Sequence, residues 1–182
     1  MRRILKKNPN TKEYWDKQYK EERYLSIGEG KDVLKNTIIT NHIIDDSRVV
    51  EIGCGAGYLL SRIKSEKQHC EVVGIEFSDE AIKKLRKDKR IIVEKGDIRT
   101  ENIGRDNSFD YAISCEVLEH LDEPEKLVRE MARVLKTGGM AIVTTPLGNH
   151  IPSPEHVWEF DTKDIEKMFK KWFESYWVYP WA

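Results

Sequence analysis

The chain has 182 residues, which suits one domain built around a single core. Its 31 Lys and Arg residues are balanced by 32 Asp and Glu residues, so the formal net charge is −1 at pH 7. This balance gives no basic field of the kind that drives nucleic-acid binding, which makes nucleic acid a disfavoured partner without excluding a local basic patch.

The sequence also lacks signals for membranes or secretion. No apolar run approaches the roughly 20 residues that cross a bilayer, and the N-terminus has no apolar segment typical of a secretory signal. Cys54, Cys70 and Cys115 are odd in number and widely spaced, so they indicate no disulfide framework. We expect a reducing, cytoplasmic setting and no membrane association.

Strand-like and helix-like segments alternate from about residue 31 onward. Helical spacing of apolar residues is seen over 33–38, 58–64, 124–135 and from 162, and Ser78 can cap another helix. Thr137-Gly138-Gly139 is expected to end the helix predicted over 124–135. Apolar and β-branched runs predict strands at 48–52, 71–76, 91–93, 109–114, 140–144 and 173–179.

This alternation predicts a doubly wound α/β fold, because a parallel connection needs a crossover and a helix supplies it. We expect a mostly parallel Rossmann-like sheet with helices on both faces. Residues 1–30 are predicted to form an N-terminal helical segment, and residues 31–182 the α/β domain.

A glycine-rich loop follows the first predicted strand, where such sheets bind ligands. Gly53, Gly55 and Gly57 alternate, so the backbone can turn sharply and approach a ligand closely. A dinucleotide fingerprint would require glycine at position 58, where the chain has Tyr58. The acidic Glu51 just before the loop favours a ligand without a pyrophosphate, although the loop alone is also compatible with a tight turn that binds nothing.

Two further carboxylates lie at the ends of the next predicted strands. Glu76 falls about 20 residues past the glycine loop, where a carboxylate can accept hydrogen bonds from both hydroxyls of a ribose. Asp97 is placed to accept from an adenine amino group, with Ile98 packing on the ring. A strand-end Glu pointing into solvent and a turn-forming Asp are the structural alternatives.

With these pieces the chain resembles the class I S-adenosylmethionine-dependent methyltransferases. The resemblance runs from about Asp32 to the end and rests on five segments in order. They are Val-Val-Glu-Ile-Gly-Cys-Gly-Ala-Gly, Gly-Ile-Glu-Phe-Ser, Gly-Asp-Ile, Phe-Asp-Tyr-Ala-Ile-Ser-Cys-Glu-Val-Leu-Glu-His-Leu and Leu-Lys-Thr-Gly-Gly-Met-Ala-Ile-Val-Thr-Thr-Pro.

The resemblance implies roles for individual residues. The methionine part of the cofactor would face Glu51 and the loop Gly53, Cys54, Gly55 and Gly57. The ribose and adenine would contact Glu76, Phe77, Asp97 and Ile98, and Cys115 would lie near the sulfonium. S-adenosylhomocysteine would be the product.

The two ends of the chain are less well defined by the resemblance. The family often places N-terminal aromatic residues over the cofactor, so Tyr14, Trp15 and Tyr19 could form a lid, or a helix face packed on the core. The family sheet usually closes with an antiparallel seventh strand, for which few residues follow Tyr179. That strand is therefore either absent or not contained in this sequence.

The segment Glu116-Val-Leu-Glu119-His120 is predicted to open a helix and to place its polar side chains on one face. His120 and Glu116 are the candidate catalytic bases, by location. With Glu119 and His156 they resemble the ligands of metal-dependent RNA 3′-terminal 2′-O-methyltransferases, which implies Mg²⁺ or a similar ion. The same segment resembles ubiquinone-pathway O-methyltransferases, and it also occurs in many small-molecule methyltransferases without metal.

The predicted function is methyl transfer from S-adenosylmethionine to an oxygen or nitrogen atom of a small-molecule acceptor. A metal-dependent RNA 2′-O-methyltransferase and a non-catalytic cofactor-binding subunit are the alternatives. The oligomeric state is not specified by the sequence.

Overall fold

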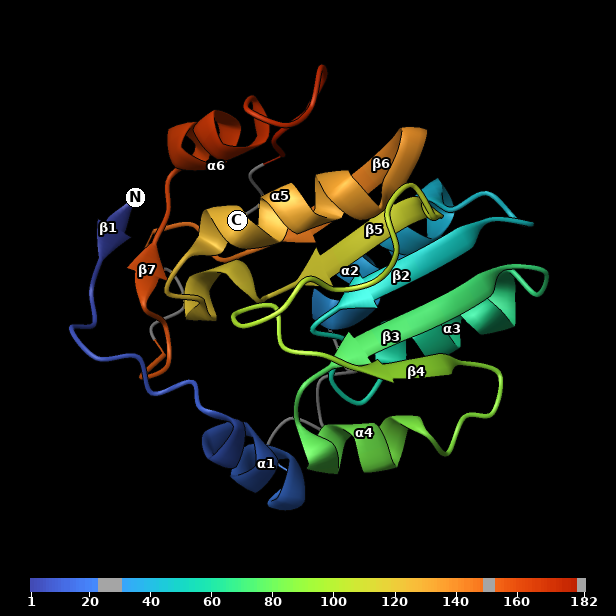
Figure 1. Ribbon diagram of the computed structural model, residues 1–182, viewed down its shortest axis with the longest axis horizontal. Coiled ribbons are helices and arrows are strands. Elements are labelled where there is room, and N and C mark those ends of the chain that lie inside the picture. Colours follow the sequence, from blue (N-terminus) through green and yellow to red (C-terminus); the bar gives the residue numbers. More distant parts are fainter. Residues whose placement is uncertain (23–30, 149–152, 180–182) are drawn as a thin grey trace.

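The computed structural model describes residues 1–22, 31–148 and 153–179, and its centre is a five-stranded parallel sheet (Figure 1). The order is β4-β3-β2-β5-β6, and every neighbouring pair is parallel. The order reverses at β2, so the expected doubly wound α/β fold is confirmed. The strands are β2 (Arg48–Ile52), β3 (Glu71–Glu76), β4 (Ile92–Lys95), β5 (Phe109–Cys115) and β6 (Leu135–Thr144).

Helices cover both faces because side chains alternate along each buried strand. On one face Val49 and Val72 pack with Ile39 and Leu60 in one apolar cluster. The helices that supply or border this cluster are α2 (Lys31–His42), α3 (Tyr58–Glu66) and α4 (Asp79–Leu85).

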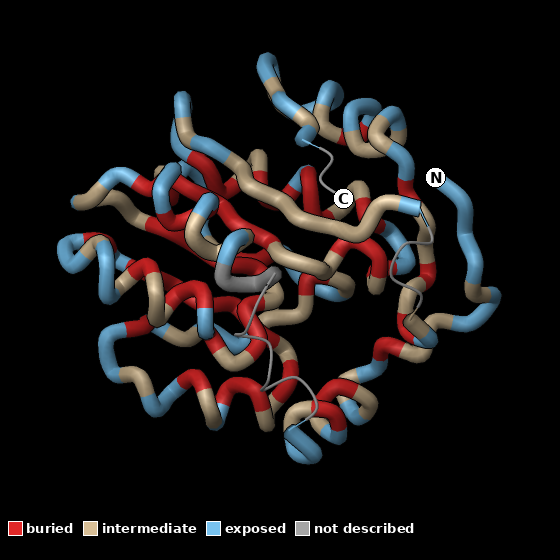
Figure 2. Tube along the Cα trace, turned by 180° about the vertical axis from the view of Figure 1, so that it is seen from behind, coloured by how far each residue is buried: buried red, intermediate tan, exposed pale blue. Residues whose placement is uncertain are grey.

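The neighbouring strand residues face the opposite layer. Val50 and Val73 pack there with Leu127 of α5 (Pro124–Val134) and with Met168 of α6 (Thr162–Phe169). Each fully buried aliphatic side chain contributes roughly 1.5–3 kcal/mol to folding. The buried trace in Figure 2 runs through β2, β3 and β5 and the inward sides of the helices, so these central strands are the packed base for the site at the edge of the sheet.

Local sequence fixes where several helices begin. Ser78 Oγ accepts a hydrogen bond from the backbone N–H of Ala81 at 3.2 Å, so the predicted cap of α4 is confirmed. Pro124 lies in the first turn of α5, where its missing N–H costs nothing. Asp161 and Asp164 form a reciprocal capping box at the start of α6.

The predicted last strand is wrong. Residues 173–179 form no strand, and Trp177 and Tyr179 are 72% and 82% exposed. The aromatic composition favours strand formation, but in the described chain no sheet edge pairs with this segment. The central sheet of the described residues has no antiparallel strand.

Two further boundaries, one at the start of β6 and one just after β5, also differ from expectation. Helix α5 ends at Val134 and β6 starts at Leu135, because Thr137 to Gly139 form an irregular part of the strand instead of a helix terminus. Glu116 has φ +55° and does not open an α-helix, so the chain makes only the short 3-10 turn η1 (Leu118–His120). The predicted shared helix face is therefore wrong.

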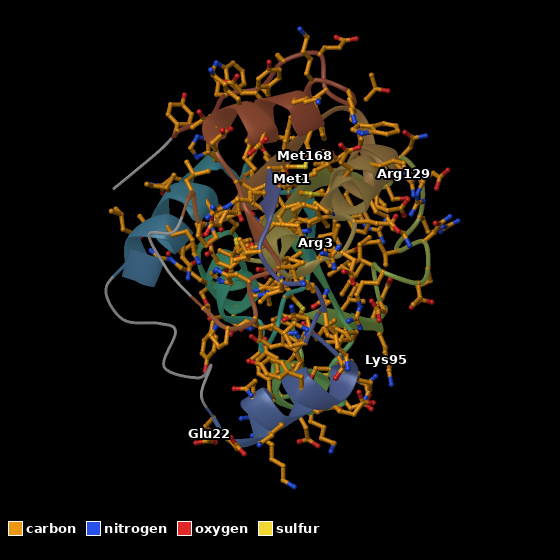
Figure 3. The ribbon with its side chains drawn as sticks, turned by 90° about the vertical axis from the view of Figure 1, so that its left-hand side faces the viewer. Met1, Arg3, Glu22, Lys95, Arg129 and Met168 are labelled. Atoms are coloured by element: carbon orange, nitrogen blue, oxygen red, sulfur yellow. The ribbon has the colours of Figure 1, made fainter. Side chains whose placement is uncertain are left out.

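The N-terminal residues cross the carboxyl ends of the strands (Figures 1 and 3). β1 (Arg2–Arg3) pairs antiparallel with β7 (Trp158–Glu159), and the chain then leads into α1 (Lys12–Lys20). The expected N-terminal helix is thus present, preceded by a short strand, while residues 23–30 of the predicted segment lie outside the described residues. No helix in the described ranges is long and apolar enough to cross a membrane.

Candidate active site

The glycine loop adopts a backbone that requires glycine. Gly53, Gly55 and Gly57 have φ of +72°, +54° and +80°. A Cβ at Gly53 would lie 2.6 Å from Cγ2 of Val117, so the loop approaches the segment after β5 very closely. Tyr19 packs over the loop in the same way, since its hydroxyl would be 2.4 Å from a Cβ at Gly55. Of the three glycines, Gly53 lines the cavity described below, whereas Gly55 and Gly57 pack against Tyr19 and Leu85.

Glu76 holds this loop from the end of β3. Its carboxylate is only 4% exposed and accepts hydrogen bonds from the backbone N–H groups of Gly55, Phe77 and Ser78 at 2.8–2.9 Å. Burial raises the pKa of Glu76, and the three N–H donors partly oppose that rise. The carboxylate lines the cavity described below, where its remaining lone pairs can accept from a ligand.

Glu51 is the second buried carboxylate beneath the loop. It is 4% exposed, and its Oε2 has no hydrogen-bond partner among the described residues. Burial raises the pKa of Glu51 to about 8, an effect that Lys35 opposes and Glu76 reinforces. A buried carboxylate oxygen without a partner is costly, and a cationic group of a ligand would satisfy it.

A cavity opens above these groups. Its walls come from the strand ends, from the N-terminal segment and from the chain after β5. Of the predicted residues it is lined by Gly53, Glu76, Phe77, Asp97, Ile98, Tyr19, Glu116 and His120. Glu51, Cys54, Gly55, Gly57, Cys115, Glu119 and His156 do not line it.

The side chains of the two cysteines predicted to contact the cofactor, Cys54 and Cys115, pack into the protein. Cys54 Sγ would be 2.8 Å from a Cβ at Gly74, and its thiol belongs to the apolar cluster beneath β2 and β3. Cys115 is half-buried and packs against the same cluster. Neither thiol therefore lines the cavity in the arrangement described here.

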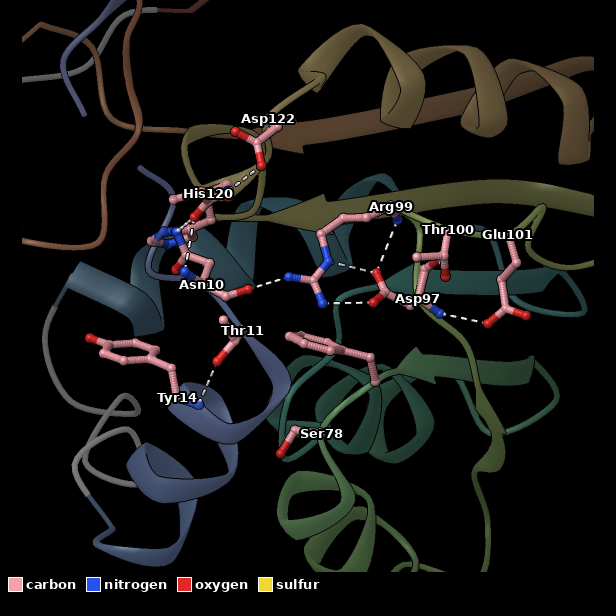
Figure 4. Close-up of polar contacts among 12 residues, drawn as sticks. Asn10, Thr11, Tyr14, Ser78, Asp97, Arg99, Thr100, Glu101, His120 and Asp122 are labelled. Carbon is pink, nitrogen blue, oxygen red and sulfur yellow. Dashed lines mark hydrogen bonds and ion pairs between the residues drawn. The ribbon is translucent and has the colours of Figure 1, made fainter. Parts of the chain in front are cut away.

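Asp97 is engaged by Arg99, a residue that the sequence did not single out. Its carboxylate accepts from Arg99 Nε at 2.8 Å and from Nη2 at 2.6 Å, and the guanidinium lies 4.5 Å from the ring centre of Phe77 (Figure 4). Burial tends to raise the pKa of Asp97, but Arg99 holds it below its usual range. A contact from Asp97 to an adenine amino group thus requires this pair to rearrange.

Arg99 also joins the strand ends to the N-terminal segment. Its Nη1 donates to the backbone carbonyl of Asn10, whose side chain donates to the carbonyl of Glu155 at 2.7 Å. Asn10 is 3% exposed, and its Oδ1 has no partner among the described residues although the residue lines the cavity. Single-sequence patterns gave no signal for Asn10 or Arg99, because both contacts join distant segments.

The aromatic residues of α1 form one wall. Trp15 is 9% exposed and lies edge-on to His120, with ring centroids 5.2 Å apart. Tyr19 and Trp15 line the cavity, while Tyr14 packs edge-on against Trp15 outside it. The positions of Trp15 and Tyr19 are compatible with a lid over the cavity. Trp15 is also packed as a buried residue.

The polar segment after β5 is held by hydroxyl donors and by a backbone carbonyl. Glu116 accepts from Thr144 Oγ1 at 2.7 Å, and Glu119, 1% exposed, accepts through Oε2 from Thr145 Oγ1 at 2.9 Å. His120 Nδ1 lies 3.2 Å from the carbonyl oxygen of Glu155.

Burial dominates the titration of this segment. It raises the pKa of Glu119 to about 8, with the nearby Glu116 adding to the effect, and lowers that of His120 to about 4. Burial also lowers the pKa of His156. Among the described residues Glu119, His120 and His156 offer ligand atoms that lie within 4.8 Å of one another. Glu116, the fourth expected ligand, does not belong to that group.

The fold and the cavity define a class I S-adenosylmethionine-dependent methyltransferase domain, and sequence comparison identifies its family. Residues 50–143 match the model of a methyltransferase domain family, and the chain belongs to that family.

The sequence is also similar to known methyltransferases. A Schizosaccharomyces pombe uncharacterized methyltransferase is 30% identical over 115 residues, which cover 57% of this chain and 41% of that protein. A ubiquinone biosynthesis O-methyltransferase of Nitrosomonas europaea is 26% identical over 56% of this chain and 45% of its own length. The chain thus spans less than half the length of these relatives.

Solved structures show the same fold. A chain of the complex between the Haloferax volcanii Trm112 methyltransferase activator and a methyltransferase matches with a TM-score of 0.72 at 18% identity, over 92% of this chain and 76% of that chain. A Haemonchus contortus phosphoethanolamine N-methyltransferase in complex with S-adenosylmethionine matches with a TM-score of 0.70 at 22% identity, over 87% and 41%.

Proposed function

We propose that the protein transfers the methyl group of S-adenosylmethionine to an oxygen or nitrogen atom of a small molecule. The observation that supports this most strongly is the convergence of the glycine loop, Glu76 and the unpartnered Glu51 Oε2 at one edge of the sheet. These groups match a ligand with a ribose and an ammonium group.

The residues present fit that cofactor. Glu51 would accept from the ammonium group, and Glu76 would accept from the ribose hydroxyls. Phe77 and Ile98 line the cavity and would pack on the two faces of the adenine, with Asp97 reaching its amino group once Arg99 shifts. When bound, the cofactor supplies a methyl group that is already strongly electrophilic.

The protein then has to position the acceptor and accept a proton. Glu116, His120 and Trp15 line the same cavity and would contact an acceptor there. Glu116 and His120 are the two candidate proton acceptors, and the Glu116 carboxylate is held in place by a hydrogen bond from Thr144. α1 would exclude water and hold the acceptor in line with the methyl group.

The RNA alternative is favoured by one observation, the grouping of Glu119, His120 and His156 beside the cavity. A turnover assay that detects S-adenosylhomocysteine separates the candidates when hydroxyl- and amine-bearing metabolites and short RNAs are compared. Turnover with a metabolite supports the proposal. Turnover with RNA alone, or with no acceptor in either group, contradicts it.

A further inference from the structure

The buried amide of Asn10 has one oxygen without a hydrogen-bond partner in the described chain. The side chain is 3% exposed and lines the cavity. Its Nδ2 donates to Asn8 Oδ1 and to the carbonyl oxygen of Glu155, both at 2.7 Å, so both amide hydrogens are used and the orientation of the amide is fixed. Oδ1 is left without a donor, and a ligand that brings one would satisfy it.

Glu116 provides a second acceptor in the same cavity. Its Oε1 accepts from Thr144 Oγ1 at 2.7 Å, and the other oxygen of the carboxylate receives no hydrogen bond from the described residues. An ionised carboxylate can only accept hydrogen bonds. This part of the cavity wall therefore has two side-chain oxygens that are able to accept from a ligand.

Arg99 and His120, which flank Asn10 in the cavity wall, use donors within the protein (Figure 4). Arg99 donates from Nε and Nη2 to Asp97, and from Nη1 to the carbonyl oxygen of Asn10. His120 Nδ1 lies 3.2 Å from the carbonyl oxygen of Glu155, which can only accept, so this nitrogen carries a proton. A carboxylate or phosphate group at Asn10 would have to compete with these partners.

The charges along the cavity have the same preference. They are the carboxylates of Glu76, Asp97 and Glu116 and the guanidinium of Arg99. Arg99 is paired with Asp97, and Glu76 accepts from three backbone N–H groups, whereas Glu116 forms no ion pair with a described residue. Attraction between opposite charges is stronger where protein replaces water, so the Glu116 carboxylate favours a positively charged ligand.

We infer that the methyl acceptor is an amine, which binds in its ammonium form with the nitrogen at Asn10 and Glu116. A primary ammonium group has three donors and no acceptor, so it matches side-chain oxygens that only accept. The carbon skeleton would pack on Trp15 and Leu121, which line the same cavity. This inference rests on the proposed function and narrows the methylated atom from oxygen or nitrogen to nitrogen.

Methyl transfer to such an acceptor releases one proton. Glu116 accepts a proton from the ammonium group, which leaves a lone pair on the nitrogen. The nitrogen then bonds to the methyl carbon of S-adenosylmethionine, while the bond from that carbon to sulfur breaks and its electron pair stays on sulfur. The products are the methylated ammonium ion and S-adenosylhomocysteine, and Glu116 passes its proton to water.

Binding of matched probes tests the inference without relying on turnover. Butyl, phenylethyl and indolylethyl skeletons are compared, each with an amine, a hydroxyl or a carboxylate as the end group. The full-length chain is titrated calorimetrically in the presence of saturating S-adenosylhomocysteine, because that ligand would shift Arg99 away from Asp97.

Two variants alter the proposed contacts, and a third is the control. Asn10→Ala removes the unpartnered oxygen, and Glu116→Gln replaces one accepting oxygen by a donating amide. Glu123→Gln changes the net charge by the same amount at an exposed acid outside the cavity. Thermal melting checks that each variant folds.

We expect amines to bind wild type and Glu123→Gln at least about tenfold more tightly than the alcohol or carboxylate of the same skeleton. Asn10→Ala should weaken amine binding. Glu116→Gln should weaken amine binding and strengthen carboxylate binding, a reversal that loss of a merely structural contact would not produce. The inference is overturned if wild type prefers alcohols or carboxylates, if no amine binds, or if amines bind both site variants as tightly as wild type.

Failure of the proposed function gives a different result. Absence of S-adenosylhomocysteine binding to wild type would contradict methyl transfer itself. Turnover of the hydroxyl probes without turnover of the amines would overturn the amine acceptor and leave methyl transfer intact.

Discussion

Two buried glutamates at the sheet edge differ in their hydrogen bonding. Glu76 is surrounded by backbone N–H donors at 2.8–2.9 Å, whereas Glu51 Oε2 has none in the described chain. The first carboxylate stabilises the loop before any ligand binds. The second is buried without a donor at Oε2, which reduces the stability of the ligand-free protein, and the proposed ammonium group of the ligand would stabilise it.

Replacing Glu51 should therefore have opposite effects on stability and binding. At pH 8 the ligand-free Glu51→Gln protein is expected to melt at a higher temperature than wild type, because a buried unpartnered charge is removed. Its affinity for S-adenosylhomocysteine should fall about tenfold to a hundredfold, since a hydrogen bond to a charged group contributes about 1.5–3 kcal/mol. Melting curves and calorimetric titration measure both; a variant with lower melting temperature and unchanged affinity would refute this role.

Residues whose role depends on the local sequence were predicted, and those that depend on distant contacts were not. Gly53 and Glu76 are recognisable because a short strand and a glycine loop specify their position. Arg99 owes its position to Asp97 on one side and to Asn10, 89 residues earlier, on the other. No pattern in one sequence reports a pairing of that kind.

At the level of elements, Asp16 links α1 to the start of α4. Its Oδ1 accepts from Ser78 Oγ at 2.7 Å and from the backbone N–H of Glu80 at 3.2 Å, at the start of α4. The same helix places Trp15 and Tyr19 in the cavity. The polar contacts of Asp16 thus determine how the lid sits over the glycine loop.

Asp16→Ala is expected to loosen α1 while leaving the sheet intact. Loss of the two hydrogen bonds should lower stability by about 1–2 kcal/mol and speed tryptic cleavage within residues 12–20. Glu21→Ala removes an exposed acid just after the same helix and serves as the control. Cleavage of Asp16→Ala no faster than that of the control would show that this contact does not hold the lid.

The element boundaries that were wrong share a physical cause. Thr137 to Gly139 look like a helix end, but pairing with β5 continues through an irregular stretch because Leu135 is already opposite Phe109. Residues 173–179 have strand-forming composition yet no sheet edge pairs with them in the described chain. Local preference specified the helices and central strands, whereas tertiary pairing decided these two segments.

On the scale of the whole molecule, Glu51 makes folding stability depend on pH. Its pKa is about 8 in the fold and near the ordinary 4.5 in the unfolded chain. Between these values the folded state retains a proton that the unfolded state has released. The free energy of unfolding therefore falls as the pH rises from 4.5 to 8, and below pH 4.5 Glu51 is protonated in both states and has no effect on it.

The difference between wild type and Glu51→Gln isolates that effect, because all other groups titrate in both proteins. From pH 5 to pH 8 the unfolding free energy of ligand-free wild type should decline relative to the variant, by an amount on the order of a few kcal/mol. Urea denaturation at several pH values gives the two curves. Parallel curves would mean that Glu51 is not protonated in the fold.

Calorimetric titration with S-adenosylhomocysteine measures whether this sheet edge binds S-adenosylmethionine and its product, as we propose. Wild type and Glu94→Ala, an exposed acid on the adjacent strand, should bind with equal affinity. Glu76→Ala and Glu76→Gln, each checked for folding by thermal melting, should bind at least about a hundredfold more weakly because the contacts to the ribose hydroxyls are lost. Binding by both Glu76 variants at wild-type affinity, or no binding by wild type, would contradict the account.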